Sequence, residues 1–383
     1  MNKKTLIIAG CSILGVLILL IVVVWLMTVF KTKYFNYETV EEKIIKATSN
    51  YYKEKPELLP VSDGRFTLPY STLVDGGYIK PLNELLKDGD NCTADIYVIR
   101  NGDVYSYVPK LNCGENYTSV ELYKQILAKT DVVETGSGLY RAADGTYYFR
   151  GKVNNNYVAF GDKIVKKQSV DLLWQIVSIS PDGVIKIKAL EPTATKTEYD
   201  SRFNVDKNSN IGYNDFELGV IHSYLNDLAK DETFLTNAEK AKLTPTFLCV
   251  EMRTEDDPTK DGSTECSKLS SDKMYFGTIT PYEYMRASLD EDCLTTVSKA
   301  CSNYNFLTSG EAKISWSITA TPADNYNAYE FNGKYYQTSF ARNKKVLYVT
   351  TNISEYAFYK SGTGTKDDPY RLFKTNKKST TEK

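Results

Sequence analysis

The chain has 383 residues, of which 42% are hydrophobic and 25% are charged, and this length allows two domains with buried cores. Lysine plus arginine number 47 against 48 for aspartate plus glutamate, which gives a net charge of −1 at pH 7. Because no excess of basic residues is present, we expect no nucleic-acid partner. The 30 tyrosines favour a strand-rich protein, with a sugar-binding surface as the alternative interpretation.

Residues 5–30 contain no charged side chain and are predicted to form a membrane-spanning helix. At about 1.5 Å per residue this helix is roughly 39 Å long, which exceeds a hydrocarbon core of about 30 Å. A cleaved signal peptide is disfavoured because its apolar region has only about 7 to 15 residues. A lipoprotein signal ending at Cys11 is disfavoured because the apolar run continues well beyond it. Lys3 and Lys4 place residues 1–4 in the cytoplasm, which predicts a single-pass cell-membrane protein with most of the chain outside the cell.

The six cysteines beyond Cys11 form three couples that are close in sequence. The chain has no CxxC motif and a single histidine, so zinc sites are disfavoured. The even number is typical of disulfide bonds in an oxidising compartment, and we expect no cofactor and no metal held by thiolates. Although six cysteines allow about fifteen pairings, proximity favours the local one. The expected disulfides are Cys92 with Cys113, Cys249 with Cys266, and Cys293 with Cys301.

Residues 31–130 are predicted to form a membrane-proximal α+β domain. An amphipathic helix begins near Asn36 as a continuation of the membrane helix, and Pro56 ends it. Residues 94–98 and 104–107 alternate like strands around Asn101-Gly102, which indicates a hairpin with a tight turn. A short helix is expected over residues 119–130.

This arrangement resembles a known class of surface proteins. A membrane helix, an amphipathic helix, the motif Leu73-Val74-x-x-Gly77-Tyr78-Ile79 and a cysteine-bounded hairpin are similar to pilin and pseudopilin subunits of Gram-positive bacteria. The resemblance implies self-association through the N-terminal helix. The chain departs from it in lacking a Gly-Phe-Thr-Leu-x-Glu processing site before the apolar run.

Residues 131–373 are predicted to form a larger, β-rich α+β domain, followed by a disordered tail at 374–383. Residues 172–179 and 184–187 form a hairpin around Pro181-Asp182-Gly183, and a helix capped by Asn214 or Asp215 follows. The segments YYFRGKVNNNYVAFG, WQIVSISPDGVIKI, FGTITPYEYMRAS and SGTGTKDDPY resemble an extracellular domain of low-GC Gram-positive bacteria. That domain is distantly similar to the C-type-lectin and formylglycine-generating-enzyme superfamily, which implies a lectin-like α+β fold with long loops.

One loop has oxygen-bearing side chains at the spacing of an EF-hand calcium site. Ile211 occupies the position where such a loop needs glycine for its sharp turn, so a plain polar loop before the helix is the preferred interpretation. The calcium candidates are Asp206, Asn208, Asn210, Asn214 and Glu217.

No catalytic constellation stands out in the sequence. A serine or cysteine nucleophile needs a base, which is usually histidine. His222 is the single histidine, and its place in a helical pattern is more typical of a packed or surface residue than of a catalytic base. The acid pairs Glu291-Asp292 and Asp367-Asp368 are more typical of solvated loops than of a glycosidase. We therefore expect a non-catalytic, membrane-anchored surface protein that contacts carbohydrate, cell wall or a protein ligand. The alternative is a pilin-like structural subunit, and a cell-wall hydrolase is a third hypothesis.

Overall fold

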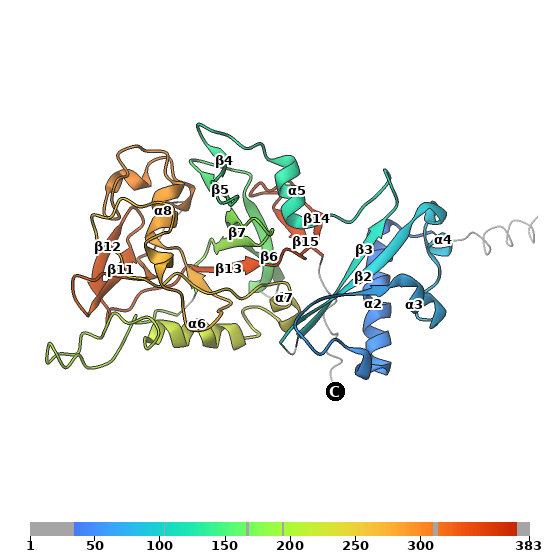
Figure 1. Ribbon diagram of the computed structural model, residues 1–383, viewed down its shortest axis with the longest axis horizontal. Helices are drawn as coiled ribbons and strands as arrows, with labels where there is room; N and C mark the ends of the chain where they lie inside the picture. The colour runs from blue at the N-terminus through green and yellow to red at the C-terminus, as the bar shows by residue number, and fades with distance from the viewer. Residues whose placement is uncertain (1–33, 103, 166–167, 194, 309–312, 374–383) are drawn as a thin grey trace, which may run out of the picture. The chain divides into compact units, whose positions relative to one another are not determined.

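The computed structural model describes residues 34–102, 104–165, 168–193, 195–308 and 313–373 (Figure 1). The chain divides into two compact units. Unit 1 contains the described residues up to Leu59, together with Leu68–Ile96 and Pro109–Thr118. Unit 2 contains Pro60–Thr67, Tyr97–Val108 and the chain from Ser119 onward.

The main helix of unit 1 is α2, which spans Tyr37–Glu54. Asn36 caps its start by accepting a hydrogen bond from the backbone N–H of Thr39 at 2.8 Å, and the helix stops two residues before Pro56. Val40 and Ile44 are fully buried on one face, whereas Lys46 on another face is exposed. The predicted amphipathic helix is therefore confirmed. Its predicted continuity with the preceding segment is wrong, because residues 34–36 are not helical and Asn36 is extended.

Short helices and a three-stranded sheet complete this part of the chain. The sheet has the order β1-β2-β3, and Gly102 provides the positive φ of +59° that the turn between β2 and β3 requires. The predicted hairpin is present, and a disulfide between Cys92 and Cys113 joins its two ends. The elements are η1 (Pro56–Leu58), β1 (Gly64–Pro69), α3 (Tyr70–Asp75), α4 (Leu82–Leu85), η2 (Gly89–Asn91), β2 (Thr93–Asn101) and β3 (Val104–Asn112).

The predicted fold class and membrane localisation need correction. The segment predicted to span the membrane, residues 5–30, lies outside the described residues. Among the described ranges, no helix is both long enough and apolar enough to cross a bilayer. The longest described helix, α2, has 18 residues and carries charged side chains opposite its buried face, so it suits packing against protein. The described chain is mostly sheet, and a transmembrane α+β protein with a single-pass anchor is not supported.

Unit 2 is built on a nine-stranded sheet with the order β14-β15-β6-β7-β8-β13-β9, to which β5 is added at β7 and β4 at β5. Most neighbours are antiparallel, whereas β15 pairs with β6 in parallel. The strands are β4 (Gly138–Arg141), β5 (Tyr147–Arg150), β6 (Tyr157–Val165), β7 (Gln168–Ile179), β8 (Ile185–Ala189), β9 (Gly277–Thr278), β13 (Val349–Ile353), β14 (Tyr359–Ser361) and β15 (Tyr370–Leu372).

A second, three-stranded sheet of unit 2 has the order β10-β11-β12, and short helices lie between the strands (Figure 1). The second-sheet strands are β10 (Ser315–Ala320), β11 (Asn327–Phe331) and β12 (Tyr336–Phe340). The helices are α5 (Leu122–Lys129), α6 (Val220–Lys230), α7 (Asn237–Lys240), α8 (Pro281–Ala287), η3 (Glu265–Ser267), η4 (Lys299–Ser302) and η5 (Phe306–Thr308).

The core of unit 2 is centred on strands that are buried on both faces, among them β10 and the last part of β7. Trp174 on β7 and Trp316 on β10 are almost completely buried, and each donates its indole N–H to a backbone carbonyl, at 2.7 and 3.0 Å respectively. Ile187 on β8 is fully buried and lies opposite Ile176 of β7. Disulfides join Cys249 to Cys266 and Cys293 to Cys301, so the expectation of disulfide bonds is confirmed.

We expect Ile187→Ala to lower the free energy of unfolding of unit 2 by about 2 to 5 kcal/mol, because it leaves a cavity under the central strands. The matched control Val170→Ala, whose position is 42% exposed, should change stability by less than about 0.5 kcal/mol. Urea unfolding followed by tryptophan fluorescence measures both. Equal effects of the two substitutions would contradict this placement of the core.

Candidate functional site

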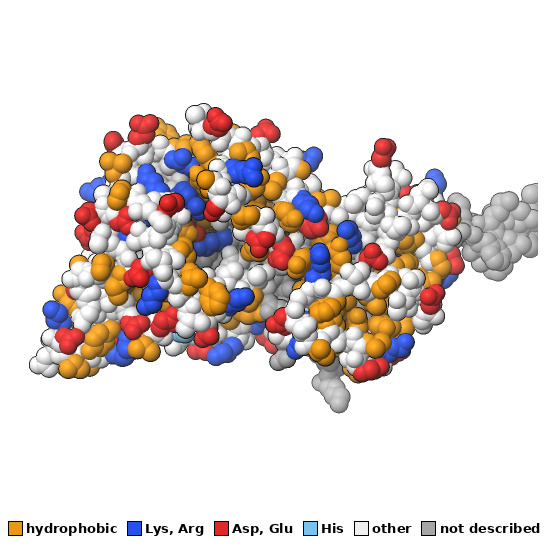
Figure 2. All heavy atoms as spheres, in the orientation of Figure 1, with side chains coloured by type: hydrophobic (Ala, Val, Ile, Leu, Met, Phe, Trp, Pro, Cys, Tyr) orange, Lys and Arg blue, Asp and Glu red, His pale blue; other side chains and the backbone are white. Residues whose placement is uncertain are grey.

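Unit 2 carries an open cleft with a volume of about 1270 Å³. Its walls come from the β4–β5 turn, the β7–β8 hairpin, two loops around the Cys249–Cys266 disulfide, and α8. In Figure 2, lysine and arginine side chains gather around a hollow in the region where Figure 1 labels β5, β7 and α8. This cleft is the candidate functional site.

Helix α8 is fixed in place by its own sequence. Pro281 occupies the first helical turn, and Thr280 and Glu283 form a reciprocal capping box. Glu283 also accepts a hydrogen bond from Lys186 of β8 at 2.5 Å, which ties the helix to the main sheet. Burial opposes ionisation of Glu283, but Lys186 and the Thr280 backbone N–H outweigh burial and lower the Glu283 pKa. The start of α8 is thereby held, and its last turn presents Arg286 to the cleft.

Tyrosines and arginines form a continuous series of ring and cation contacts along one wall. Arg286 lies 4.5 Å from the ring centroid of Tyr148 and 5.4 Å from that of Tyr282. Tyr148 stacks on Tyr140 with 5.9 Å between ring centroids, and Arg150 lies 4.9 Å from the Tyr140 centroid. The cation–π contacts hold both guanidinium groups in defined positions without neutralising them.

A third cation, Lys260, lies near Arg150. Burial lowers the pKa of Lys260, the positive charge of Arg150 lowers it further, and Asp290 opposes the shift. In the described part of the chain, neither Arg150, Lys260 nor Arg286 has a carboxylate within ion-pair distance. Arg150 donates from Nη2 to the carbonyl of Ser288 at 2.8 Å, while its buried Nε has no hydrogen-bond partner among the described residues.

The loop that carries Lys260 is held by a buried arginine. Arg253 has 0% side-chain exposure and pairs with Glu265 at 2.9 Å. Its other N–H groups donate to the carbonyls of Asp257 and Thr259, at 2.8 and 2.6 Å, and to the Thr296 hydroxyl at 2.8 Å. The buried Arg253 side chain therefore holds the loop in place.

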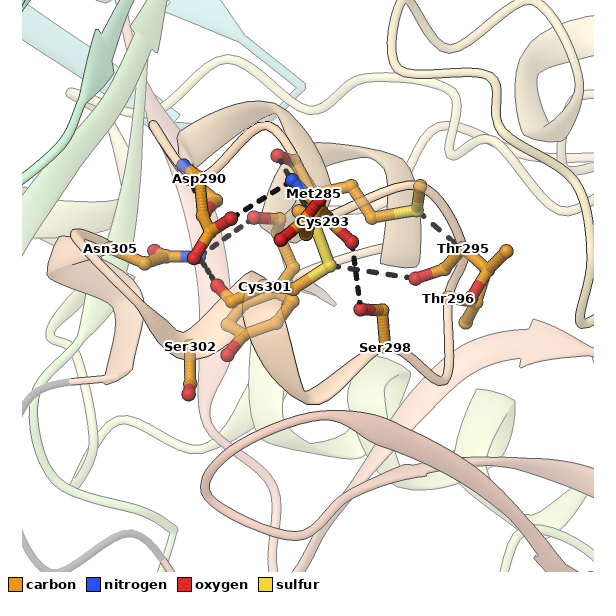
Figure 3. Close-up of a disulfide and its surroundings, with 12 residues drawn as sticks. Met285, Asp290, Cys293, Thr295, Thr296, Ser298, Cys301, Ser302 and Asn305 are labelled. Carbon is orange, nitrogen blue, oxygen red and sulfur yellow. Dashed lines mark hydrogen bonds between the residues drawn. A yellow bond between two sulfur atoms is a disulfide. The ribbon is translucent and has the colours of Figure 1, made fainter.

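Figure 3 shows the Cys293–Cys301 disulfide and the residues around it, which include Thr296 and Asn305. Asn305 donates from its amide to the carbonyls of Tyr284 and Cys301, both at 2.8 Å. Thr296, which lies in the disulfide-closed loop, accepts the Nε–H of Arg253. The disulfide loop, α8 and Arg253 thus form one connected support beneath the cleft.

Glycine is required where the loop meets α8. Gly262 has a φ of +90°, and a Cβ there would lie 3.0 Å from the Tyr282 ring. A side chain at this position would be strained and would push against Tyr282. The absence of a side chain lets the loop approach α8 closely.

The rest of the cleft lining is rich in hydroxyl groups, which both donate and accept hydrogen bonds. The serines and threonines include Thr146, Ser178, Thr244, Thr246, Ser263 and Thr350. Asn352 adds an amide, and Tyr148 and Phe247 add aromatic surface.

The cleft carboxylates are engaged in local structure. Asp144 accepts from Thr146 at 2.9 Å and Asp182 accepts from Ser180, so each stabilises its own turn. Asp261 accepts from the Ser263 N–H at 2.9 Å, and this bond, together with Arg286 nearby, lowers its pKa. The pKa values of Asp261 and Glu283 are both lowered. A general acid needs the opposite shift.

Three of the calcium candidates, Asp206, Asn214 and Glu217, have side-chain hydrogen-bond partners in the structure. The Asn214 amide donates to the carbonyls of Thr321, Asp324 and Asn327 at 2.8 to 3.0 Å, and Glu217 accepts from Ser271 at 2.8 Å. Two others, Asn208 and Asn210, lie in the turn that follows Asp206, which accepts from Asn325 at 2.6 Å. Within the described ranges, one grouping has metal-ligand geometry, Asp88 with Cys92 and Cys113, but its sulfurs are bonded to each other.

The residues considered for catalysis lie apart from the cleft lining. The Nε2 of His222 on α6 lies 3.7 Å from the Oε2 of Glu217, and the His222 ring packs edge-on against Phe216. Glu291 and Asp292 are exposed beside the Cys293 loop, and Asp368 lies 3.8 Å from Arg371. None of these groups lines the cleft.

Sequence reasoning missed Arg150, Lys260 and Arg286. One usable signal was spacing: Tyr148 and Arg150 are two apart on a strand, and Tyr282 and Arg286 are four apart on a helix, so each couple shares a face. Whether the two couples lie close together depends on tertiary contacts. Their proximity could therefore not be predicted from the local sequence pattern.

Comparison with known proteins gives no match: no protein-family profile, curated protein or solved structure is significantly similar to the chain. The pilin-like and lectin-like resemblances therefore stay predictions that depend on short motifs.

A second unusual group is Lys188 on β8, which is 8% exposed. Its ammonium lies 4.9 Å from the Tyr348 ring centroid, and burial lowers its pKa to about 8. Such a lysine resembles an activated amine nucleophile. The adjoining cavity, however, has a volume of about 20 Å³, which fits about one water molecule. No substrate fits there, so Lys188 is a structural residue.

We expect Lys188→Met to be more stable than wild type at pH 7, by up to about 3 kcal/mol, and to lose this advantage as the pH rises. Between the folded pKa of about 8 and the ordinary value of 10.5, the unfolded chain binds a proton that the folded chain does not. The charged lysine therefore destabilises the fold below pH 8, and this penalty disappears toward pH 10. Urea unfolding from pH 7 to 10 tests it, with exposed Lys344→Met as the control. A constant difference between variant and wild type would contradict it.

We expect Glu265→Leu to destabilise unit 2 by about 3 to 5 kcal/mol, because it leaves the buried Arg253 charge without its principal partner. The double variant Arg253→Met with Glu265→Leu should recover part of that loss, since the unpaired charge is gone. The exposed control Glu291→Leu should lie within about 0.5 kcal/mol of wild type. Tryptophan-detected urea unfolding distinguishes these cases, and a double variant less stable than Glu265→Leu would be inconsistent with the charge explanation.

Proposed function

We propose that the protein is a non-catalytic binding protein whose unit 2 cleft holds a segment of a polysaccharide. The observation that carries the proposal is the open cleft of about 1270 Å³ lined by serine, threonine and asparagine side chains. Sugar hydroxyls lose hydrogen bonds to water when they bind, so a site for them needs replacement donors and acceptors. Hydroxyl and amide side chains supply both. The aromatic surface of Tyr148 and Phe247 adds apolar contact of the kind found in ligand sites.

The cleft carboxylates support binding over hydrolysis. Glycoside hydrolysis needs one carboxyl group with a raised pKa and a second carboxylate across the scissile bond. Asp144 and Asp182 hold their own turns, Glu283 is paired with Lys186, and Asp261 has a lowered pKa. These groups are better suited to maintaining the shape of the walls than to transferring protons.

The disulfides support the setting of this proposal. The three disulfides are typical of an oxidising compartment outside the cytosol. Cell-wall carbohydrate is found in such a compartment. The alternative of a pilin-like subunit depends on the N-terminal segment that the described residues do not include.

We expect the full chain to bind at least one immobilised polysaccharide in a panel of neutral and acidic polymers, measured by biolayer interferometry. Ser263→Trp should weaken that binding about tenfold or more, because a bulky ring at this exposed lining position obstructs the cleft. Lys268→Trp, on the same loop but outside the lining, serves as the matched control. Absence of binding to every polymer, or equal binding by both variants, would overturn the proposal.

A further inference from the structure

We propose that the cleft selects polysaccharides that carry carboxylate groups, and that Arg150, Lys260 and Arg286 recognise those groups. This inference rests on the proposed function, because it names the chemical class of ligand for the same cleft. It adds a charge requirement that a hydroxyl-lined cleft alone does not impose.

The charge pattern of the cleft is the first support. Lys186 is neutralised by Glu283, whereas Arg150, Lys260 and Arg286 have no ion pair in the described ranges. Like charges held close together and partly withdrawn from water destabilise one another. In keeping with this, burial and then the positive charge of Arg150 lower the pKa of Lys260, and Asp290 opposes the shift. A ligand anion placed among the three cations would relieve that repulsion.

The rim carboxylates do not cancel the cations. Asp144 and Asp182 are exposed and accept hydrogen bonds within their own turns. Asp261 is also exposed, and its Oδ1 accepts from the Ser263 N–H at 2.9 Å rather than forming an ion pair with Arg286. The interior cations are thus left for a ligand, while the acids hold the turns that surround them.

The geometry of Arg286 favours a planar anion. Its guanidinium lies within 5.4 Å of two tyrosine ring centroids, which fixes the group and leaves its N–H edge for the ligand. A fixed guanidinium matches a carboxylate through two parallel hydrogen bonds. Arg150 adds a second guanidinium to the cleft lining, placed by its Nη2 hydrogen bond to the Ser288 carbonyl and by its contact with Tyr140.

The experiment compares polymers that differ only in their carboxylates. The full chain is titrated with polygalacturonate and with its fully methyl-esterified form, and in parallel with hyaluronan and its carboxyl-reduced form. We expect at least one acid form to bind about tenfold or more tightly than its neutral counterpart. Dextran sulfate serves as the polyanion without carboxylates.

The variants assign the effect to the three cations. Arg286→Gln and Lys260→Gln should each weaken binding of the acid form by about ten- to a hundredfold, with little change for the neutral form. Arg286→Lys should fall between wild type and Arg286→Gln, since it keeps the charge but loses the paired hydrogen bonds. Exposed Lys268→Gln is the matched charge control, and urea unfolding checks that each variant is folded.

Three outcomes would contradict the carboxylate requirement. Equal binding of acid and neutral forms would overturn the carboxylate requirement while leaving polysaccharide binding intact. Dextran sulfate binding as tightly as the acid polymers, with the same loss in Lys268→Gln, would show general polyanion attraction and would also overturn it. Binding to no polymer would overturn both this inference and the proposed function.

Discussion

The buried pair of Arg253 and Glu265 is the interaction on which the organisation of unit 2 depends. Removing two charges from water is costly, so the pair persists only because its hydrogen-bonding groups are satisfied. Arg253 is satisfied by Glu265, by two loop carbonyls and by the Thr296 hydroxyl. Those partners come from three segments of chain. Any rearrangement of one segment would leave a buried charge without a partner, and the pair therefore specifies one geometry for all three.

This constraint reaches the cleft through Glu265. Its Oε1 accepts the backbone N–H of Tyr282 at 3.0 Å, while its Oε2 accepts from Arg253. Tyr282 lies in the first turn of α8 and flanks Arg286, so the buried pair positions both the helix and the loop that faces it. Disulfides on either side, at Cys249–Cys266 and Cys293–Cys301, limit the loops in the unfolded chain as well. The shape of the cleft is therefore determined by the buried groups that hold its walls.

Local helices and strands could be predicted from the sequence, but the tertiary contacts between them could not. The hairpin between β7 and β8 followed from alternation around Pro181-Asp182-Gly183, and α2 followed from its apolar spacing. The helix expected to follow a cap at Asn214 or Asp215 begins instead at Val220, after Gly219, and the Asn214 amide donates to three carbonyls at residues 321–327. The cleft cations come from a strand, a loop and a helix that are distant in sequence, so no local pattern could bring them together.

The two kinds of cation in unit 2 support a division of roles. Arg253 is completely buried and fully partnered, as a structural charge must be if the fold is to be stable. Arg150 and Arg286 are only partly buried, and tyrosine rings and, for Arg150, the Ser288 carbonyl are the described neighbours that place them. Lys260 is also partly buried and lies near Arg150 and Asp290. A structural role would be served as well by neutral side chains, which would avoid the mutual repulsion. Retention of three unneutralised cations around one hollow is better explained by an anionic ligand that completes the site.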